Sequence, residues 1–452
     1  MKPLNLFTEP FELKNIQECR IDKGVNEHFH AVISGYFMSP EADEIYEKCM
    51  SKTDFVIKAT TDDGEEATLF RGDICDIRIC TEEGAVRVTV CAQSKTVLLD
   101  RERHIRTYQG RDQSYRDIID QVLSCYKDTA LIQPKGKGAR VEGLVVQYEE
   151  TDWELLKRLA SQLHMVLVPD CTNDHICFYF GNPEKKIRGE LETKEYSMRR
   201  YLDRNGKERV EYSVDSRQIR QLCEGVMVHG SPCYIYRIRG YMKGQELKFE
   251  YTLRSLAGFE VPETYNERLS GVSLMGTVRE VSGIRVRMDI SSEDDLTYGN
   301  PMWFLFSTVY STPDGTGWYC MPEPGDRVRL YIPGNQEKEA YVISAVHMEN
   351  EQGLRKDPEE KSIRTRWQKE IRLTPDKIVL TNHKGISITL DDNEGIIIKS
   401  SRKIQIISDS EVEIKGSRVQ IEGQSGVLLM EGPNMLMVRD GIKEQGMHIE
   451  HR

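Results

Sequence analysis

The side chains that could carry chemistry in this 452-residue sequence are scattered, and they match none of the usual catalytic signatures. The sequence has no H-E-x-x-H metal motif, no G-x-S-x-G nucleophile motif and no phosphate-binding P-loop. The nearest fragment is Gly423–Gly426, with the sequence GQSG, which lies inside a repetitive region and is predicted to be a turn. We therefore expect a protein that is not an enzyme, with no catalytic residues and no cofactor.

Two pairs of histidines have spacings that deserve a separate interpretation. His28 and His30 alternate on a predicted strand and could face the same side, where a surface or interface role is favoured over metal binding. Near the C-terminus, His448 and His451 form an H-x-x-H pattern in a glycine-containing tail. No metal site is predicted, but the sequence leaves open whether His448 and His451 bind a metal.

An aromatic run could stack on single-stranded nucleic acid, as the aromatic residues of some small β-barrels do. The rings belong to Trp303, Phe304, Phe306 and Trp318. However, the chain contains 73 acidic against 62 basic residues, a formal charge of -11, which opposes attraction to a polyanion. We predict that these rings pack in a core and that nucleic acid is not a partner.

Cysteine usage and the N-terminus indicate where the chain is made. The eleven cysteines are odd in number and include no C-x-x-C pair, which is typical of a reduced cytosolic protein. The first residues, MKPLNLFTEPFELKN, place acidic groups where a signal peptide has an apolar core, and no run of about 18 apolar residues occurs. The sequence predicts cytoplasmic assembly without a signal peptide.

The periodicity of apolar residues predicts a mainly β protein with minor α content. Val86, Val88 and Val90 alternate as in a half-buried strand. Two segments instead have apolar residues at spacings of three and four, predicting helices over 113–126 and 152–164. The second helix begins with Thr151 and Glu154 in the positions of a capping box.

We predict seven successive regions, because a chain of this length exceeds a single core. A first β-barrel covers 1–112, a helical insertion covers 113–164, and a second β-barrel covers 165–268. Short strands with dense glycine and proline at 269–348 predict an OB-like five-stranded barrel. A charged linker at 349–370, a repetitive β segment at 371–432 and a C-terminal tail at 433–452 complete the chain.

The repetitive segment carries pairs of apolar residues at steps close to eight, separated mainly by polar residues and glycine. A single ribbon of this kind has one apolar face and no second layer to cover it. Each side chain left in water forgoes roughly 1.5–3 kcal/mol. Three copies around a common axis would bury these faces together, which predicts a homotrimeric needle. A single-chain β-solenoid or β-sandwich is the alternative. The predicted trimer core comprises Ile388, Ile396, Ile398, Ile404, Ile406, Val412, Ile414, Val419 and Ile421.

This order of regions resembles the VgrG family and the related hub and spike proteins of phage tails, in which a hub like phage late control protein D is joined to an OB barrel and a β-helical needle. One segment that carries the resemblance is Val145–Asp170, VVQYEETDWELLKRLASQLHMVLVPD. A second is Ser311–Pro333, STPDGTGWYCMPEPGDRVRLYIP, which is similar to the OB segment of the family. The resemblance covers nearly the whole chain.

The resemblance implies a structural baseplate hub and membrane-puncturing spike of a contractile injection system. The hub would adapt a three-fold spike to a hexameric inner tube protein and contact other baseplate proteins in a phage tail or tail-like particle. Met435, Leu436 and Met437 would plug the needle or dock a PAAR-type tip protein. Similar phage spikes close their apex with a metal held by histidines in an H-x-H pattern, whereas this chain has an H-x-x-H pattern. A trimeric tailspike that binds carbohydrate or hydrolyses cell wall is the alternative.

Overall fold

The computed structural model describes most of the chain in two compact units, 1–347 and 348–452, and each unit is considered by itself. Within these units the described residues are 5–37, 54–60, 64–82, 85–110, 113–132, 136, 138–183, 185–191, 196–203, 206–228, 230–291, 297–345 and 357–450. The predicted fold class, mainly β with minor α, is confirmed. In these ranges no helix has the length and apolar character needed to cross a bilayer.

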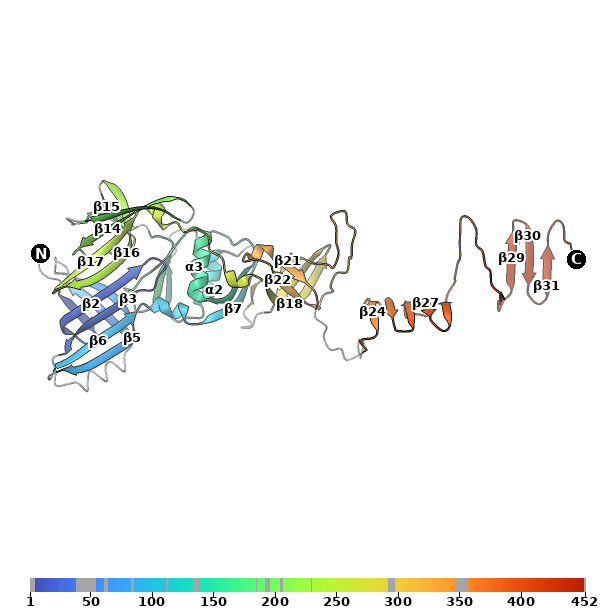
Figure 1. Ribbon diagram of the computed structural model, residues 1–452, viewed down its shortest axis with the longest axis horizontal. Helices are drawn as coiled ribbons and strands as arrows, with labels where there is room; N and C mark the ends of the chain where they lie inside the picture. Colours follow the sequence, from blue (N-terminus) through green and yellow to red (C-terminus); the bar gives the residue numbers. More distant parts are fainter. Residues whose placement is uncertain are drawn as a thin grey trace. The chain divides into compact units, whose positions relative to one another are not determined.

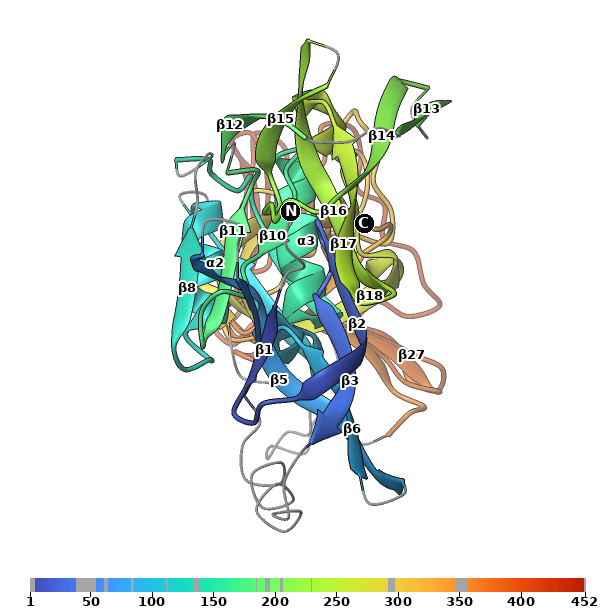
Figure 2. The ribbon, with the colours of Figure 1, turned by 90° about the vertical axis from the view of Figure 1, so that its left-hand side faces the viewer.

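A 12-stranded sheet dominates the first unit, and it joins the two segments that were predicted as separate barrels. Strand β2 (Lys14–Gly24) pairs with β16 (Ser231–Lys243), from Arg237 opposite Gly24 to Tyr241 opposite Arg20. Figure 2 shows these two strands side by side, with helix α3 behind them. One core of buried residues accordingly includes Ile33 and Phe70 from the first segment and Ile235 and Tyr251 from the second.

The strand order along the main path of this sheet is β1-β4-β5-β6-β3-β2-β16-β17-β14-β13, and β12 joins β16 through β15. The remaining strands of the sheet are β1 (Leu6–Glu9), β3 (His30–Phe37), β4 (Asp54–Thr60), β5 (Glu66–Glu82), β6 (Ala85–Gln93), β12 (Lys185–Glu190), β13 (Tyr196–Leu202), β14 (Glu208–Ser216), β15 (Glu224–Val228) and β17 (Glu246–Arg254).

Helices α2 (Tyr115–Leu123) and α3 (Asp152–Gln162) lie beside two small sheets, as Figure 1 shows. Both begin with the capping box that their sequences specify: in α3 the Thr151 hydroxyl accepts from the Glu154 amide, and the Glu154 carboxylate accepts from the Thr151 amide. The small sheets contain β8 (Thr129–Ile132), β10 (Leu167–Pro169) and β11 (Ile176–Phe180), and β7 (Arg103–Gln109), β9 (Val145–Thr151) and β20 (Thr297–Gly299).

A small five-stranded barrel follows in the chain, as the OB-like pattern predicts. Its strands run in the order β21 (Met302–Leu305), β19 (Arg285–Ile290), β18 (Val272–Ser282), β22 (Arg327–Ile332) and β23 (Tyr341–Ile343). The barrel closes where Ser307 donates its amide to the Val342 carbonyl beyond the end of β21. Short 3-10 turns complete the unit: η1 (Lys95–Asp100), η2 (Leu256–Phe259), η3 (Glu267–Leu269) and η4 (Glu337–Glu339).

The second unit contains two antiparallel sheets (Figure 1). The first is a five-stranded meander of β24 (Lys361–Arg364), β25 (Glu370–Leu373), β26 (Lys377–Thr381), β27 (Ile386–Asp391) and β28 (Gly395–Ser400). The second contains β29 (Val427–Glu431), β30 (Asn434–Val438) and β31 (Ile442–Gln445). Strand β24 lies inside the segment predicted as a linker, so the described part of that linker is not all loop.

Candidate functional site

The meander β24–β28 has one face that is almost entirely apolar. Because side chains alternate along a strand, the pairing of Ile388 with Ile398 and of Leu390 with Ile396 places all four on the same side. All members of this face are exposed in the single chain. The opposite face is mainly polar and includes Thr389 and Lys399. The apolar face is made by Ile363, Ile371, Leu373, Ile378, Leu380, Ile386, Ile388, Leu390, Ile396 and Ile398.

The next part of the predicted trimer core has a different structure. Residues 401–426 contain no strand, although they carry three of the predicted apolar pairs. Their side chains are exposed, with Ile406 at 72% and Ile414 at 67%. The structure thus brings Ile388, Ile396 and Ile398 together but leaves the rest of the predicted core without a partner strand in its own chain. The residues concerned are Ile404, Ile406, Val412, Ile414, Val419 and Ile421.

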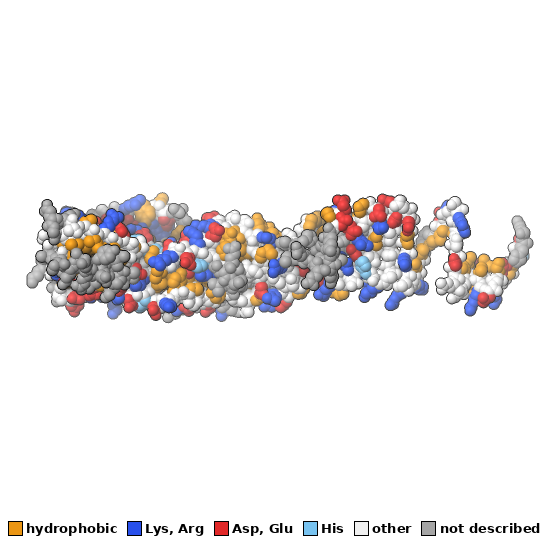
Figure 3. Space-filling view, turned by 90° about the horizontal axis from the view of Figure 1, so that it is seen from below, with side chains coloured by type: hydrophobic (Ala, Val, Ile, Leu, Met, Phe, Trp, Pro, Cys, Tyr) orange, Lys and Arg blue, Asp and Glu red, His pale blue; other side chains and the backbone are white. Residues whose placement is uncertain are grey.

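The predicted tip residues Met435, Leu436 and Met437 all lie on β30, the central strand of the last sheet. Strand alternation places Met435 and Met437 on one face, with Met430 and Leu428 opposite them on β29. Leu436 lies on the other face, opposite Leu429. Strands β29 and β30 therefore carry apolar side chains on both faces, whereas β31 adds Lys443 and Gln445 to the first face and Glu444 to the second. Figure 3 shows hydrophobic side chains gathered along this sheet at the right-hand end.

The C-terminal histidines do not form a described metal site. His448 is exposed, and its Nε2 lies 3.1 Å from a carboxylate oxygen of Glu450. His451 lies outside the described residues. No group of three or more potential ligands is close enough to hold a metal ion in the part of the chain that is described.

The GQSG fragment forms a turn, in which the Gly426 amide donates to the Gly423 carbonyl at 3.2 Å. The aromatic run of the OB-like barrel is divided. Phe304 is buried and Trp303 and Phe306 are half-buried, but Trp318 is 59% exposed, so its assignment to a core was wrong. Trp318 lies in a long loop, where sequence proximity to the other rings does not determine packing.

His28 and His30 do not share an environment, contrary to the expectation that they alternate on one strand. His30 begins β3 and is exposed, whereas His28 precedes the strand. The His28 ring packs 4.7 Å from the Trp153 ring, and its Nδ1 and Nε2 lie 2.9 Å from the Thr96 hydroxyl and 3.3 Å from the Asp100 carboxylate. Burial lowers the pKa of His28 and outweighs the opposing attraction of Asp100.

A buried charge cluster connects α3 to the OB-like barrel, and it was not anticipated from the sequence. Arg158 on α3 donates from Nε and Nη2 to the two oxygens of Glu150, at 2.9 and 2.8 Å. Its Nη1 donates at 2.9 Å to Glu337 of η4, and its Nη2 also reaches the Val146 carbonyl at 2.8 Å. Glu337 accepts from the Val146 amide as well. The sequence places Arg158 in a predicted helix, but no local pattern connects it to Glu337, which lies 179 positions further along the chain.

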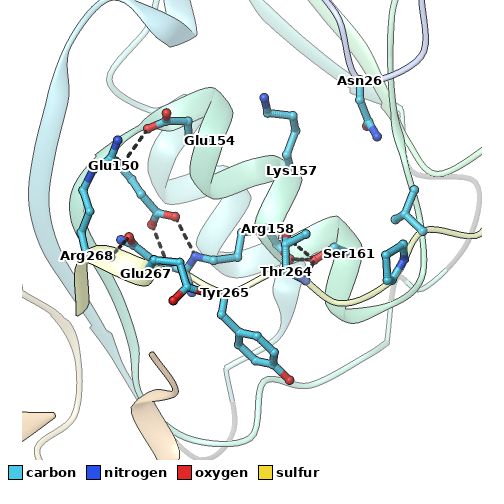
Figure 4. A pocket seen from close by; sticks show the side chains of 13 residues that line it. Asn26, Glu150, Glu154, Lys157, Arg158, Ser161, Thr264, Tyr265, Glu267 and Arg268 are labelled. Carbon is cyan, nitrogen blue, oxygen red and sulfur yellow. Dashed lines mark hydrogen bonds and ion pairs between the residues drawn. The ribbon is translucent and has the colours of Figure 1, made fainter. Parts of the chain in front are cut away.

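Glu150 and Arg158 of this cluster border a pocket of about 650 Å³ between α3 and the segment before the barrel. Figure 4 shows Glu150 directed toward Arg158 and Lys157 directed away from it. Burial alone would lower the pKa of Arg158, but Glu337 and Glu150 more than compensate and raise it, so the guanidinium stays charged. Both carboxylates are therefore used to hold Arg158, and Arg158 links helix α3 to η4 of the barrel through Glu337.

Comparison with known proteins gives matches through structure alone. No family model matches the sequence, and no curated protein matches it. The E. coli c3393 protein is described as a component of the type VI secretion system with structural similarity to T4 bacteriophage tail proteins gp27 and gp5. It matches with a TM-score of 0.52 at 14% identity, over 76% of this chain and 100% of that chain.

Two structures of a PdpA-VgrG complex also match. The Francisella complex in its half-lidded form has a TM-score of 0.55 at 9% identity, over 88% of both chains. The lidless complex has a TM-score of 0.56 at 10% identity, over 88% of this chain and 98% of that chain. At these identities the likeness concerns the fold. At that level the resemblance to VgrG-related proteins and phage tail proteins is confirmed.

Proposed function

We propose that this chain is the structural hub and spike of a contractile injection system and that it acts as a homotrimer. The observation that carries the proposal is the exposed apolar face of β24–β28, whose opposite face is mainly polar. Completing the burial of ten half-exposed aliphatic side chains would stabilise the assembly by on the order of 10 kcal/mol per chain. Two further copies supply the same face, and the fold shared with VgrG-related proteins supports this arrangement.

The segment 401–426 fits the same assembly, because strands from neighbouring copies would satisfy its backbone groups. Its apolar residues, from Ile404 to Ile421, would then continue the core of the needle. Such a rod resists unfolding because many strands must separate together. It delivers force and does not require bond chemistry.

The last sheet, β29–β31, supplies the surface on which a tip protein would dock. A three-fold arrangement of identical sheets covers one face of each sheet, and strands β29 and β30 carry apolar side chains on both faces. The face with Met435 and Met437 or the face with Leu436 would remain available to a PAAR-type tip protein.

The hub would contact a hexameric inner tube protein and other baseplate proteins, and the particle would assemble in the cytoplasm before delivery outward. The alternative, a tailspike that binds carbohydrate or hydrolyses cell wall, has no comparable support. The pocket carboxylate of Glu150 is held by Arg158 through both oxygens, so each of its oxygens already has a partner within the chain.

Native mass measurement of the purified full chain tests the proposal, with an expected mass three times that of one chain. Replacing Ile398→Asp together with Ile406→Asp should abolish the trimer while the β-sheet signal of the first unit persists. The control Ser387→Asp together with Thr389→Asp introduces the same two charges on the polar face of β27 and should leave the trimer intact. A monomeric wild-type chain, or a trimer unaffected by the isoleucine substitutions, would refute the needle assembly.

A further inference from the structure

The loop between β21 and β22 contains an ordered hairpin, Thr308–Tyr319, which we call the OB hairpin. The Trp318 amide donates to the Tyr310 carbonyl at 2.8 Å, and the Thr308 hydroxyl donates to the Trp318 carbonyl at 2.7 Å. Gly317 permits this close approach, since a Cβ at that position would lie 2.3 Å from the Tyr310 oxygen. The Tyr319 hydroxyl donates to Gly283 at 3.0 Å and anchors the hairpin on the barrel.

This hairpin holds large apolar side chains in fixed positions outside the core. Val309 is 87% exposed, and Trp318 and Tyr319 are also exposed. Ile284 and Leu305 extend the surface onto the barrel: the Ile284 carbonyl accepts from the residue after Leu305. A group of exposed apolar side chains on a hydrogen-bonded hairpin is typical of an interaction surface, because part of the ordering cost of the loop is met before binding.

We propose that the OB hairpin packs against a second copy of this chain, an inference that rests on the proposed trimer. In copies joined at the needle, each barrel is connected to the needle by the segment between Ile343 and Lys361. This segment can span at most about 60 Å, so the barrels of the three copies stay close to one another. Tethers of this length create effective concentrations on the order of millimolar, which a separate protein must exceed to compete.

The charge of the hairpin also permits hairpins of neighbouring copies to meet around a three-fold axis, where equal charges would repel one another. Asp314 is the only charged residue of the OB hairpin. Its carboxylate accepts from the Thr312 hydroxyl and from the Thr316 amide, so it is engaged within the turn. The two flanks, which carry Tyr310 and Trp318, are free of charge, so one flank of a hairpin suits the other flank of the neighbouring copy in the head-to-tail contact that a trimer makes.

A photo-crosslinking experiment on the full chain tests this contact. Val309→p-benzoylphenylalanine places the reactive group on the hairpin, and Arg279→p-benzoylphenylalanine on the exposed side of β18 is the matched control. After irradiation, position 309 should give covalent dimers and trimers in about tenfold higher yield than position 279. The double change Trp318→Ser with Tyr319→Ser should lower the yield from 309 about tenfold while native mass still shows a trimer.

The possible results separate this inference from the proposed function. A trimer by native mass without crosslinks from 309 above the control, or with crosslinks only within one chain, overturns the hairpin contact and leaves the hub-spike function standing. An undiminished yield in the double variant also overturns it. A chain that never forms a trimer overturns the proposed function and the hairpin contact together.

Discussion

Replacing Arg158 with methionine is expected to destabilise the first unit strongly, because two buried carboxylates would lose the cation that they share. Arg158 is 3% exposed, Glu150 is 4% exposed and Glu337 is 9% exposed, so the two carboxylates depend on the guanidinium for most of their charge compensation. Removing one partner of a buried ion pair typically costs about 3–5 kcal/mol. Arg158→Met also removes the bond to the Val146 carbonyl, which places the expected loss toward the upper end of that range.

Thermal unfolding followed by the fluorescence of the buried Trp153 measures this effect in the full chain. A loss of this size in a unit of several hundred residues lowers Tm by on the order of 10 °C. The control is Lys157→Met on the same helix, since Lys157 forms no ion pair with any described residue and points away from the cluster in Figure 4. Equal Tm changes in the two variants would contradict the shared-cation interpretation.

A charge-matched rescue sharpens the test. Adding Glu150→Gln and Glu337→Gln to Arg158→Met removes the two uncompensated charges and should recover part of the lost stability. If the triple variant is no more stable than Arg158→Met, the cost arises from packing rather than from buried charge.

The remaining predictions concern three sites in the first unit. The pKa of His28 is lowered in the folded state, so the contribution of neutral His28 to stability is fully present above the unfolded pKa of about 6.5 and is lost as pH falls below that value. His28→Gln should therefore flatten the dependence of Tm on pH below about 6.5. An unchanged slope would argue against this role of His28. Gly299→Ala should lower Tm, since a Cβ would lie 1.7 Å from the Gln109 oxygen and φ is +92°, whereas Gly138→Ala, with open space around it, should not. Thr151→Ala removes the cap of α3 and should cost about 1 kcal/mol in denaturant unfolding; no loss would mean that the cap is dispensable.

Local patterns were sufficient for the elements whose stability depends on neighbours in the chain. The spacing of apolar residues and the Thr151–Glu154 capping box predicted helix α3, and both capping bonds are present. The alternation in Ile386–Asp391 and Gly395–Ser400 predicted strands with one apolar side. These features repeat over two to four residues, so the sequence carries them directly.

The arrangement of distant segments was decided by tertiary structure. Nothing local to β2 or β16 specifies that they pair across more than 200 residues, because any exposed strand edge offers the same backbone groups. The contact of Arg158 with Glu337 and the exposure of Trp318 likewise depend on how loops close around the barrel. Sequence by itself determined the helices, the strands with strong alternation and the one-sided ribbon of β26–β28, but it also predicted strands in residues 401–426, where the single chain has none, and missed β24. Only the folded chain determined which of their surfaces meet, since packing selects among many edges and faces of equal local propensity.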